Sequence, residues 1–369
     1  MYEGRVSKLD ELLERAGFDG LALIPGPNLF YLTGLRFHLM ERPVVLLHRT
    51  RGRTALVLPE LEAGKVGEES GLRLFTYGED PASWAAVFRS ALSLAGVDAP
   101  GARIAVESTH LRFLELSLLQ DAAPVAEFLA GDVALDALRI TKDDDEIQAI
   151  HQAVRIAERA FTELLASLKP GISEREVAAD LMVQLLRAGS DPDVPFAPIV
   201  ASGPNSANPH ATPTDRRLAP GDLLVIDWGA AYQGYCSDLT RTVAIGEIEP
   251  ELGRVYDLVE QANLIGRQHA RVGMPAGEVD GAAREVIARG GYGDRFIHRL
   301  GHGFGLEEHE PPYLHGENAQ PLQAGMTFTI EPGIYLPGRG GVRIEDDVLL
   351  TAGGPQVLSS LSRALTQIG

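Results

Sequence analysis

The sequence predicts an α+β protein of two domains, and three observations support this. Residues 1 to about 135 alternate helix-like with strand-like segments. From residue 142 onward, a pattern of two helices followed by strands occurs twice. Each copy of the pattern places carboxylates on its strands. We therefore expect an N-terminal α/β domain over residues 1–135 and a larger domain of two similar halves over residues 142–369.

The N-terminal domain is expected to begin with an amphipathic helix over Arg5–Ala16. Three apolar segments typical of buried strands follow it: Gly20–Pro25, Pro43–Leu47 and Thr54–Leu58. A break near Ala134–Thr141 precedes the charged run Lys142–Glu146. Because acidic residues stabilise the N-terminus of a helix through its dipole, this run predicts the start of a long helix.

Each half of the second domain has the pattern of helix, turn, helix and strand. The segment Gly171–Gly189 aligns with Gly273–Gly291 at an offset of 102 residues. Asp227 then aligns with Glu331 at an offset of 104 residues, each at the end of a strand. A second strand in each half carries a further carboxylate. Two halves that face each other would bring all four carboxylates to their shared interface.

Four carboxylates and one histidine of this domain are candidate ligands of two metal ions. They are Asp227 in VIDWG, Asp238 in YCSDLTRT, His302 in GHGFG, Glu331 in TIEPG and Glu345 in GVRIED. In a dry cleft four carboxylates would repel one another, whereas two divalent cations cancel their charge. Two cations roughly 3.5–4 Å apart can share a bridging water and lower its pKa towards neutrality. Oxygen-rich ligation with one imidazole suits Mn²⁺, Co²⁺, Zn²⁺ or Fe²⁺.

Two of the candidate ligands lie on an expected hairpin. An apolar strand over Leu223–Ile226 leads to Asp227, residues 230–234 form the turn, and residues 235–244 return. Side chains two positions apart share a face of a strand, which places Asp238 with Thr240 and Thr242. Two carboxylates on neighbouring strands can therefore reach the same pair of metal ions.

The second half is expected to repeat this arrangement with Glu331 and Glu345. Arg343 shares a face with Glu345, so we expect its guanidinium to hold a carboxylate in place. Cys236 lies on the same face as Asp238. There we expect a small buried spacer rather than a metal ligand.

Composition and charge narrow the classes of partner. The formal net charge is −18, which argues against binding of nucleic acid or of an anionic membrane surface. The single cysteine excludes an internal disulfide and fits a reducing compartment. No stretch approaches the roughly 20 apolar residues of a membrane span, and the N-terminus lacks the apolar core of a signal peptide. We therefore expect a soluble cytoplasmic protein.

These motifs resemble those of the pita-bread metallopeptidases, a family that includes methionine aminopeptidase, aminopeptidase P, prolidase and the non-peptidase creatinase. The resemblance covers essentially the whole chain, and the ligand order Asp, Asp, His, Glu, Glu is that of the family. The N-terminal domain resembles that of prolidase, aminopeptidase P and creatinase. The resemblance implies a pita-bread catalytic domain after a creatinase-type domain, with two metal ions, Mn²⁺ first and Co²⁺ or Zn²⁺ as alternatives.

The resemblance also implies a role for each ligand. Asp238 and Glu345 would bridge both metal ions. Asp227 would complete one metal site, and His302 and Glu331 would complete the other. Glu331 would also take the proton from the bridging water.

Three further histidines match the proline-specific members of the family: His210 in NPHATP, His298, and His309 in GLEEHEPP. Cleavage of an amide needs groups that polarise the carbonyl, stabilise the oxyanion and protonate the leaving nitrogen. We expect the histidines to supply these roles. Tyr335 in EPGIY matches a tyrosine near the site of aminopeptidase P.

An Xaa-Pro bond is a tertiary amide without an N–H, so the site needs a dedicated pocket for the proline ring. Phe196 and the glycine-rich segment Gly303–Gly305 are candidates for this pocket, although core packing also accounts for Phe196. Arg343 is a further candidate for substrate binding.

A dipeptidase must also recognise the terminal carboxylate of its substrate, for which arginine is suited because it binds carboxylate bidentately. Eukaryotic-type prolidases carry such an arginine between the second catalytic histidine and the EPG motif, but residues 310–323 contain none here. Arg339 is a candidate replacement. Arg36 and Arg42 are others, reaching across a homodimer that the resemblance implies.

The expected function is hydrolysis of the Xaa-Pro bond in short peptides, as an Xaa-Pro dipeptidase that releases proline. The alternative is an aminopeptidase P that acts on longer peptides. Two other hypotheses are a creatinase-like reaction without metal and a non-catalytic binding module. The complete ligand set argues against both.

Overall fold

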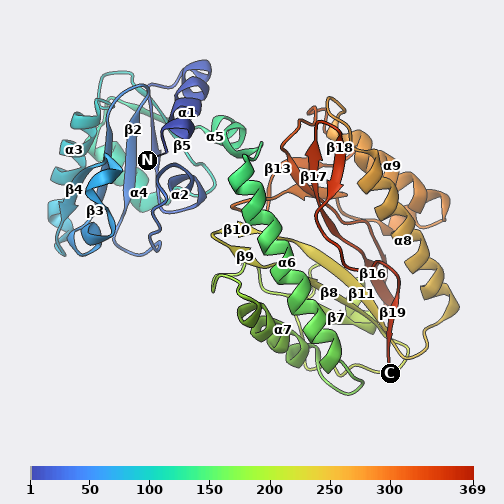
Figure 1. Cartoon of the computed structure of the whole chain (residues 1–369). Helices are drawn as coiled ribbons and strands as arrows, with labels where there is room; N and C mark the ends of the chain where they lie inside the picture. Colours follow the sequence, from blue (N-terminus) through green and yellow to red (C-terminus); the bar gives the residue numbers. More distant parts are fainter. Residues whose placement is uncertain (1) are drawn as a thin grey trace. The chain divides into compact units, whose positions relative to one another are not determined.

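The structure is a computed structural model that describes residues 2–369, and it divides into two compact units (Figure 1). The first unit comprises Met1–Arg139 and the second comprises Ile140–Gly369. The described residues contain no helix long and apolar enough to cross a membrane.

The first unit is built on a six-stranded mixed sheet with the strand order β4-β3-β2-β1-β5-β6. Its strands are β1 Gly20–Leu23, β2 Val45–Arg49, β3 Thr54–Pro59, β4 Arg73–Tyr77, β5 Arg103–Val106 and β6 Glu127–Ala130. Strand β2 is antiparallel to β1 and β3, and the other pairings are parallel. The three strands expected from the sequence are present with shifted ends.

Five α-helices accompany this sheet: α1 Glu3–Ala16, α2 Pro27–Thr33, α3 Trp84–Ala95, α4 Phe113–Ala122 and α5 Asp132–Arg139. Short 3₁₀ turns are η1 Glu60–Lys65, η2 Glu68–Ser70 and η3 Pro81–Ser83. Helix α1 buries Leu9 and Leu13 and ends at Gly17, whose φ of 73° suits glycine. Helix α5 occupies most of the segment expected as a break, because Leu135 and Leu138 give it a buried face.

The second unit begins with the long helix predicted from the charged run. Helix α6 spans Asp144–Ser167. Asp143 and Glu146 form a capping box at its N-terminus, in which each side chain accepts from the other residue's backbone N–H. The other helices are α7 Glu174–Ala188, α8 Pro250–His269 and α9 Ala276–Arg289. Two 3₁₀ turns are η4 Gly203–Ala207 and η5 Gly293–Arg295.

Two sheets and two hairpins complete this unit. The first sheet has the order β19-β11-β8-β7, with β7 Ile199–Ser202, β8 Leu223–Trp228, β11 Leu239–Ile245 and β19 Thr366–Ile368. The second has the order β13-β12-β14-β17-β18, with β12 Gly301–Gly303, β13 Glu310–Leu314, β14 Thr327–Ile330, β17 Asp346–Thr351 and β18 Gly354–Val357. The hairpins pair β9 Ala231–Tyr232 with β10 Tyr235–Cys236, and β15 Gly333–Leu336 with β16 Gly340–Arg343.

The two halves repeat one topology. In the first half, α6 and α7 precede the antiparallel strands β7, β8 and β11. In the second half, α8 and α9 precede the antiparallel strands β12, β14 and β17. Helices α6 and α7 lie on one side of the sheets and α8 and α9 on the other (Figure 1). Each helix pair shares a hydrophobic core with its own sheet, so the expected pair of halves is confirmed.

The hairpin that carries two candidate ligands differs in detail from the prediction. Strand β8 continues through Asp227 to Trp228, and the turn narrows to Gln233 and Gly234, which both have positive φ. The returning strand is interrupted at Asp238, which lies between β10 and β11. The interruption has a physical cause, because the backbone N–H of Asp238 donates to the side chain of Asp347 in the other half.

Candidate metal centre

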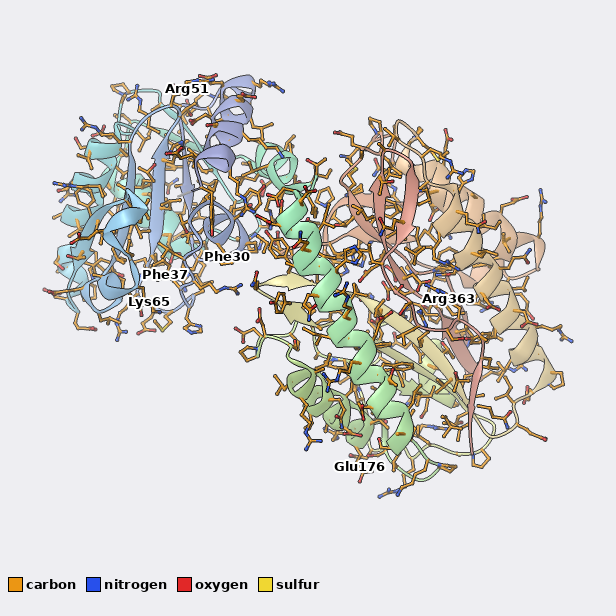
Figure 2. All side chains as sticks on the ribbon, viewed as in Figure 1. Phe30, Phe37, Arg51, Lys65, Glu176 and Arg363 are labelled. Atoms are coloured by element: carbon orange, nitrogen blue, oxygen red, sulfur yellow. The ribbon has the colours of Figure 1, made fainter. Side chains whose placement is uncertain are left out.

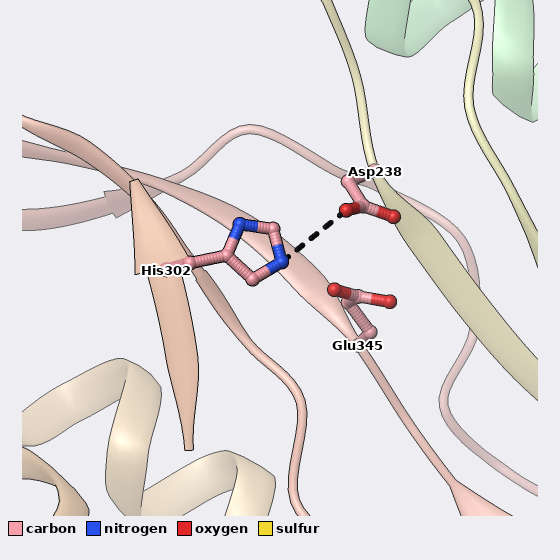
Figure 3. Close-up of side chains that lie close together, drawn as sticks. All are labelled: Asp238, His302 and Glu345. Carbon is pink, nitrogen blue, oxygen red and sulfur yellow. Dashed lines mark ion pairs between the residues drawn. The ribbon is translucent and has the colours of Figure 1, made fainter. Parts of the chain in front are cut away.

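The five candidate ligands converge from both halves of the second unit. Asp227 lies on β8, Asp238 before β11, His302 on β12, Glu331 directly after β14, and Glu345 between β16 and β17. Figure 3 shows three of them, Asp238, His302 and Glu345, whose donor atoms all lie within 4.8 Å of one another. The His302 Nε2 atom is 3.6 Å from Asp238 Oδ2 and 3.4 Å from Glu331 Oε1.

Each half orients a ligand of the other half. The Arg343 guanidinium binds the Asp227 carboxylate, as predicted for a partner that holds a ligand in place. In the opposite direction, the Thr240 hydroxyl donates to Glu345 Oε2 at 2.6 Å. The backbone N–H of Glu345 donates to the Thr240 carbonyl at 3.1 Å. The arrangement of the carboxylates therefore depends on both halves being assembled.

The electrostatics of the cluster fit a divalent metal centre. Burial, followed by repulsion from neighbouring carboxylates, raises the pKa of Asp238 and of Glu345 well above the usual range. Burial also raises the pKa of Glu331 to about 8. The buried Asp227 Oδ1 atom has no hydrogen-bond partner among the described residues. Cations would stabilise the ionised carboxylates and give this oxygen a partner.

Burial favours the neutral form of three histidines of the site, His298, His302 and His309, by lowering their pKa. Burial lowers the pKa of His298 to about 3, with a further contribution from the Arg343 charge. Burial and the Arg299 charge lower the pKa of His309 to about 4. The His309 ring meets the His302 ring edge-on, with 4.0 Å between centroids. Neutral imidazoles can coordinate a metal ion or accept a proton.

A cavity of about 350 Å³ opens onto the five candidate ligands. His210, His298 and His309 also line it, as do Phe196 and Arg343. Tyr335 is buried behind this wall, where its hydroxyl lies 2.9 Å from His298 Nε2 and 2.9 Å from Arg343 Nη1. These predicted residues therefore either line the cavity or, in the case of Tyr335, contact residues that line it.

Other predicted residues lie elsewhere or have a different environment. Arg339 does not line the cavity, because its guanidinium binds Glu249 and Glu251, each at 2.6 Å. Its expected contact with the substrate carboxylate is therefore not supported. Arg36 belongs to the first unit, where its guanidinium lies 4.1 Å from the centre of the Phe30 ring. Arg42 is also in the first unit and binds Glu79.

The glycine-rich segment and the cysteine serve packing. A Cβ atom on Gly303 would lie 2.3 Å from the Pro311 carbonyl oxygen, so the close approach of β12 and β13 requires glycine there. Gly303 and Gly305 are not among the residues that line the cavity, which corrects their expected contact with the proline ring. Cys236 is buried outside the ligand cluster, and burial raises the pKa of its thiol.

Two charged residues of the cavity were not predicted, Arg299 and Glu308. Arg299 lies over the Tyr313 ring, with 4.5 Å to its centroid, and its guanidinium has no hydrogen-bond partner among the described residues. Its position in the sequence between His298 and His302 could have indicated that Arg299 lies near the site. Burial, followed by the Asp227 charge, raises the pKa of Glu308 to about 7.

Comparison with known proteins agrees with this geometry. The model of the Creatinase/Prolidase N-terminal domain matches residues 5–141, and that of metallopeptidase family M24 matches residues 148–352, more than half of the chain. The chain belongs to metallopeptidase family M24. This M24 chain is 38% identical over 362 residues to the probable dipeptidase PepE of Mycobacterium bovis, covering 96% of this chain and 93% of that protein.

Two solved structures are similar over their whole length to this M24 chain. A dipeptidase from Pyrococcus horikoshii superposes with a TM-score of 0.93 at 39% identity, covering 99% of this chain and 100% of that one. A prolidase from Thermococcus sibiricus also has a TM-score of 0.93, at 35% identity, covering 100% and 99%. The pita-bread fold and the creatinase-type N-terminal domain expected from the sequence are thus confirmed.

Proposed function

We propose that this protein is a metal-dependent Xaa-Pro dipeptidase that acts on short peptides in the cytoplasm as a homodimer. The observation that carries the proposal is the cavity itself, which brings the carboxylate cluster together with His210, His298 and His309 and with the Arg299 guanidinium. The names of similar proteins, dipeptidase and prolidase, support the same reaction. The catalytic domain is proposed to span residues 142–369.

The donor set is suited to two divalent ions, with Mn²⁺ proposed first. Asp238 and Glu345 are proposed to contact both ions, Asp227 one of them, and His302 and Glu331 the other. When bound, such ions supply Lewis acidity and an activated water. Glu331 is the proposed acceptor of the proton from the attacking water, because its carboxylate lines the cavity beside the other candidate ligands, 3.4 Å from His302 Nε2.

The histidines are proposed to act on the substrate amide. His309 and His210 line the cavity. They are proposed to donate hydrogen bonds to the scissile carbonyl as negative charge develops on its oxygen. His298 is proposed to assist proton transfer to the leaving proline nitrogen, and Tyr335 supports its ring. Phe196 supplies an apolar wall for the proline ring.

Arg299 is proposed to bind the terminal carboxylate of the dipeptide. Of the cavity's two arginines, Arg343 is already bound to Asp227, whereas the guanidinium of Arg299 is unpaired among the described residues. Stacking on Tyr313 orients the guanidinium plane without using its N–H donors. A carboxylate near the proline ring would therefore meet a pre-oriented partner.

The test compares an Xaa-Pro dipeptide with the matching Xaa-Pro-Yaa tripeptide in the presence of Mn²⁺. We expect proline release from the dipeptide and little cleavage of the tripeptide. Arg299→Gln should raise the KM for the dipeptide by about 10- to 100-fold, the value of a charge-assisted hydrogen bond. Arg339→Gln is the matched control and should leave the KM unchanged.

Preferred cleavage of the tripeptide would instead indicate an aminopeptidase P. Failure to cleave either peptide, with metal confirmed as bound, would contradict proline specificity. An unchanged KM in Arg299→Gln, with cleavage of the dipeptide retained, would overturn only the role of Arg299.

A further inference from the structure

A buried carboxylate in the first half of the second unit lies outside the metal centre. Glu174 is the first residue of α7 and has 0% of its surface exposed. Its Oε1 atom accepts hydrogen bonds from the backbone N–H of Ser202 at 2.7 Å and from the Ser202 hydroxyl at 2.8 Å. Its Oε2 atom accepts from the backbone N–H of Thr214 at 3.0 Å and from the Thr214 hydroxyl at 2.6 Å. The amide of Asn205 donates to both oxygens at 3.1 Å.

These partners lie on both sides of His210. Asn205 precedes it in η4, and Thr214 follows it in a segment without regular secondary structure. No strand ladder or helix therefore fixes the backbone at His210. Further contacts lie within the segment: the Arg343 guanidinium donates to the Pro209 carbonyl at 3.2 Å, the Gly341 N–H donates to the Ser206 hydroxyl at 2.8 Å, and the His210 N–H donates to Asn208 Oδ1 at 3.2 Å. Glu174 thus closes the base of the loop that carries a histidine into the cavity.

Among the described residues, every hydrogen-bond partner of the Glu174 carboxylate is a donor. The Arg216 guanidinium, whose charge also acts on Glu174, donates to the Ser202 hydroxyl at 2.6 Å instead of forming a direct ion pair with the carboxylate. A buried carboxylate without a direct ion pair is costly unless hydrogen bonds compensate it. The site is therefore built for a carboxylate rather than for an amide, whose NH₂ group would face other donors.

The second half shows that the fold does not need this carboxylate. In the first half, the backbone N–H groups of residues 174 and 175 donate to the carbonyls of Arg216 and Thr214. In the second half, the N–H groups of residues 276 and 277 donate to the carbonyls of Gln320 and Asn318. The helix positions differ by 102 residues and the carbonyl positions by 104, the offsets of the internal repeat.

The backbone contact between the helix N-terminus and the following loop is thus common to both halves. Only the first half adds a carboxylate to it, because Ala276 occupies the position equivalent to Glu174. The first-half loop is also the one that carries a histidine to the cavity.

We infer that Glu174 is a positioning residue for His210, fixing the Asn205–Thr214 loop so that the imidazole meets the substrate. The inference rests on the proposed role of His210. It assigns to Glu174 no contact with substrate. Loss of the carboxylate should leave the fold and the metal ligands in place and let the imidazole move away from the scissile carbonyl.

The test is a double-mutant cycle between Glu174→Gln and His210→Ala, with kcat/KM measured on an Xaa-Pro dipeptide. Misplacement of a catalytic group costs on the order of 10²-fold, so we expect Glu174→Gln to lower kcat/KM by about 10- to 100-fold. In the His210→Ala background the same change should cost less than about twofold, because the imidazole it positions is gone. Thr214→Val, which removes one donor without changing the backbone, should give a smaller loss in the same direction.

Glu176→Gln is the matched control. Glu176 lies on the same helix at the surface (Figure 2) and closes the capping box with Ser173. Glutamine also serves at this position of a capping box, so Glu176→Gln removes a charge near the start of α7 without freeing the loop. It should leave kcat/KM within about twofold of wild type. Hydrogen exchange gives a readout independent of activity, and amides of residues 205–214 should exchange faster in Glu174→Gln than in Glu176→Gln.

An equal loss of activity in the presence and absence of His210, or unchanged exchange in residues 205–214, would overturn the positioning role. Wild-type kcat/KM in His210→Ala would overturn it as well. Dipeptide cleavage by the wild-type protein would still stand in each case, which separates this failure from failure of the proposed function.

Discussion

The two halves of the second unit share a backbone plan but fix their ligand strands by different interactions. Residue 161 on α6 and residue 263 on α8 are equivalent at the repeat offset of 102. In the first half, the Phe161 ring stacks on Trp228, with 4.5 Å between centroids and an interplanar angle of 11°. In the second half, the Asn263 amide donates to the carbonyls of Ile330 at 3.0 Å and Ile344 at 3.2 Å.

Both the ring stacking and the Asn263 hydrogen bonds involve residues directly beside candidate ligands. Trp228 follows Asp227, and its indole N–H also donates to the Ala157 carbonyl on α6 at 3.0 Å. Ile330 and Ile344 each precede a ligand glutamate. The comparison teaches that the repeat preserves where a long helix meets the ligand strands. It does not preserve the chemistry of that contact, which is apolar stacking in one half and hydrogen bonding in the other.

The largest expected effect tests whether the two halves contribute equally to the metal centre. Asp238→Ala removes a ligand from the first half and Glu345→Ala one from the second. Because both are proposed to contact both ions, each change should reduce turnover to background and abolish metal binding. Metal content by mass spectrometry and proline release check this. The exposed Asp215→Ala is the control. Retained activity in either variant would contradict the shared role.

The next effect concerns the apolar contact. Phe161→Ala deletes a buried ring that stacks on Trp228, which should destabilise the protein by about 3–5 kcal/mol. Urea unfolding followed by tryptophan fluorescence measures the change. The protein has two tryptophans, so the measurement is made in a background with Trp84→Phe, which leaves Trp228 as the reporter. A loss below that of Asn263→Ala would show that stacking is the weaker of the two contacts.

The polar contact is expected to be worth less. Asn263→Ala leaves two buried carbonyls without their donor, which should cost about 1–3 kcal/mol. The Arg267 guanidinium also loses its acceptor on Asn263. The same urea measurement applies, and Asn263→Asp is informative because it keeps the volume but removes the donors. If Asn263→Asp were as stable as wild type, the two donated hydrogen bonds would not hold the strands.

The smallest effect is a pH dependence at the cavity wall of the metal-free protein. The pKa of Glu308 is raised from 4.5 to about 7 in the folded protein. Between these values the folded state binds more protons at Glu308 than the unfolded state does, so stability falls as pH rises. Glu308→Gln stays neutral and escapes this loss. Its stability relative to wild type should therefore be near zero at pH 4 and should increase to a plateau above pH 7.

Thermal unfolding of both chelator-treated proteins across this pH range checks the prediction. A constant difference between wild type and Glu308→Gln at all pH values would contradict it. Added divalent metal should reduce the difference, because neutralisation of Asp227 removes one cause of the raised pKa.

Local patterns in the sequence account for most of what was predicted correctly. Helical spacing, acidic residues at the start of α6 and strand-like apolar runs are short-range patterns, and the elements that they predict are present in the structure. The repeat offset and the motifs around each residue identified the five candidate ligands, which all line one cavity. Contacts between side chains that are far apart in the sequence could not be predicted in this way. Arg339 binds two glutamates about 90 residues away along the chain, while Arg299, adjacent to a predicted histidine, faces the cavity.

Details of backbone geometry could not be predicted from the sequence either. The strand interruption at Asp238 depends on a carboxylate from the other half, Asp347, which no local pattern reveals. The hydrogen bonds to Glu174 are similar, because their donors, Ser202 and Asn205 in one segment and Thr214 in another, reach the start of α7 only in the folded structure. A helix was missed at residues 132–139 because it is only 8 residues long, a length at which apolar spacing does not distinguish a helix from a strand.

The contact of Arg343 with Asp227 has a consequence for the order of events during synthesis. The ribosome makes Asp227 and Asp238 well before Arg343 and Glu345. Until the later segment emerges, the early carboxylates lack the arginine that orients one of them and the glutamate that completes the cluster. Because part of the proposed donor set is still missing at that stage, we expect a nascent first half to hold metal only weakly and the metal centre to assemble when the second half docks.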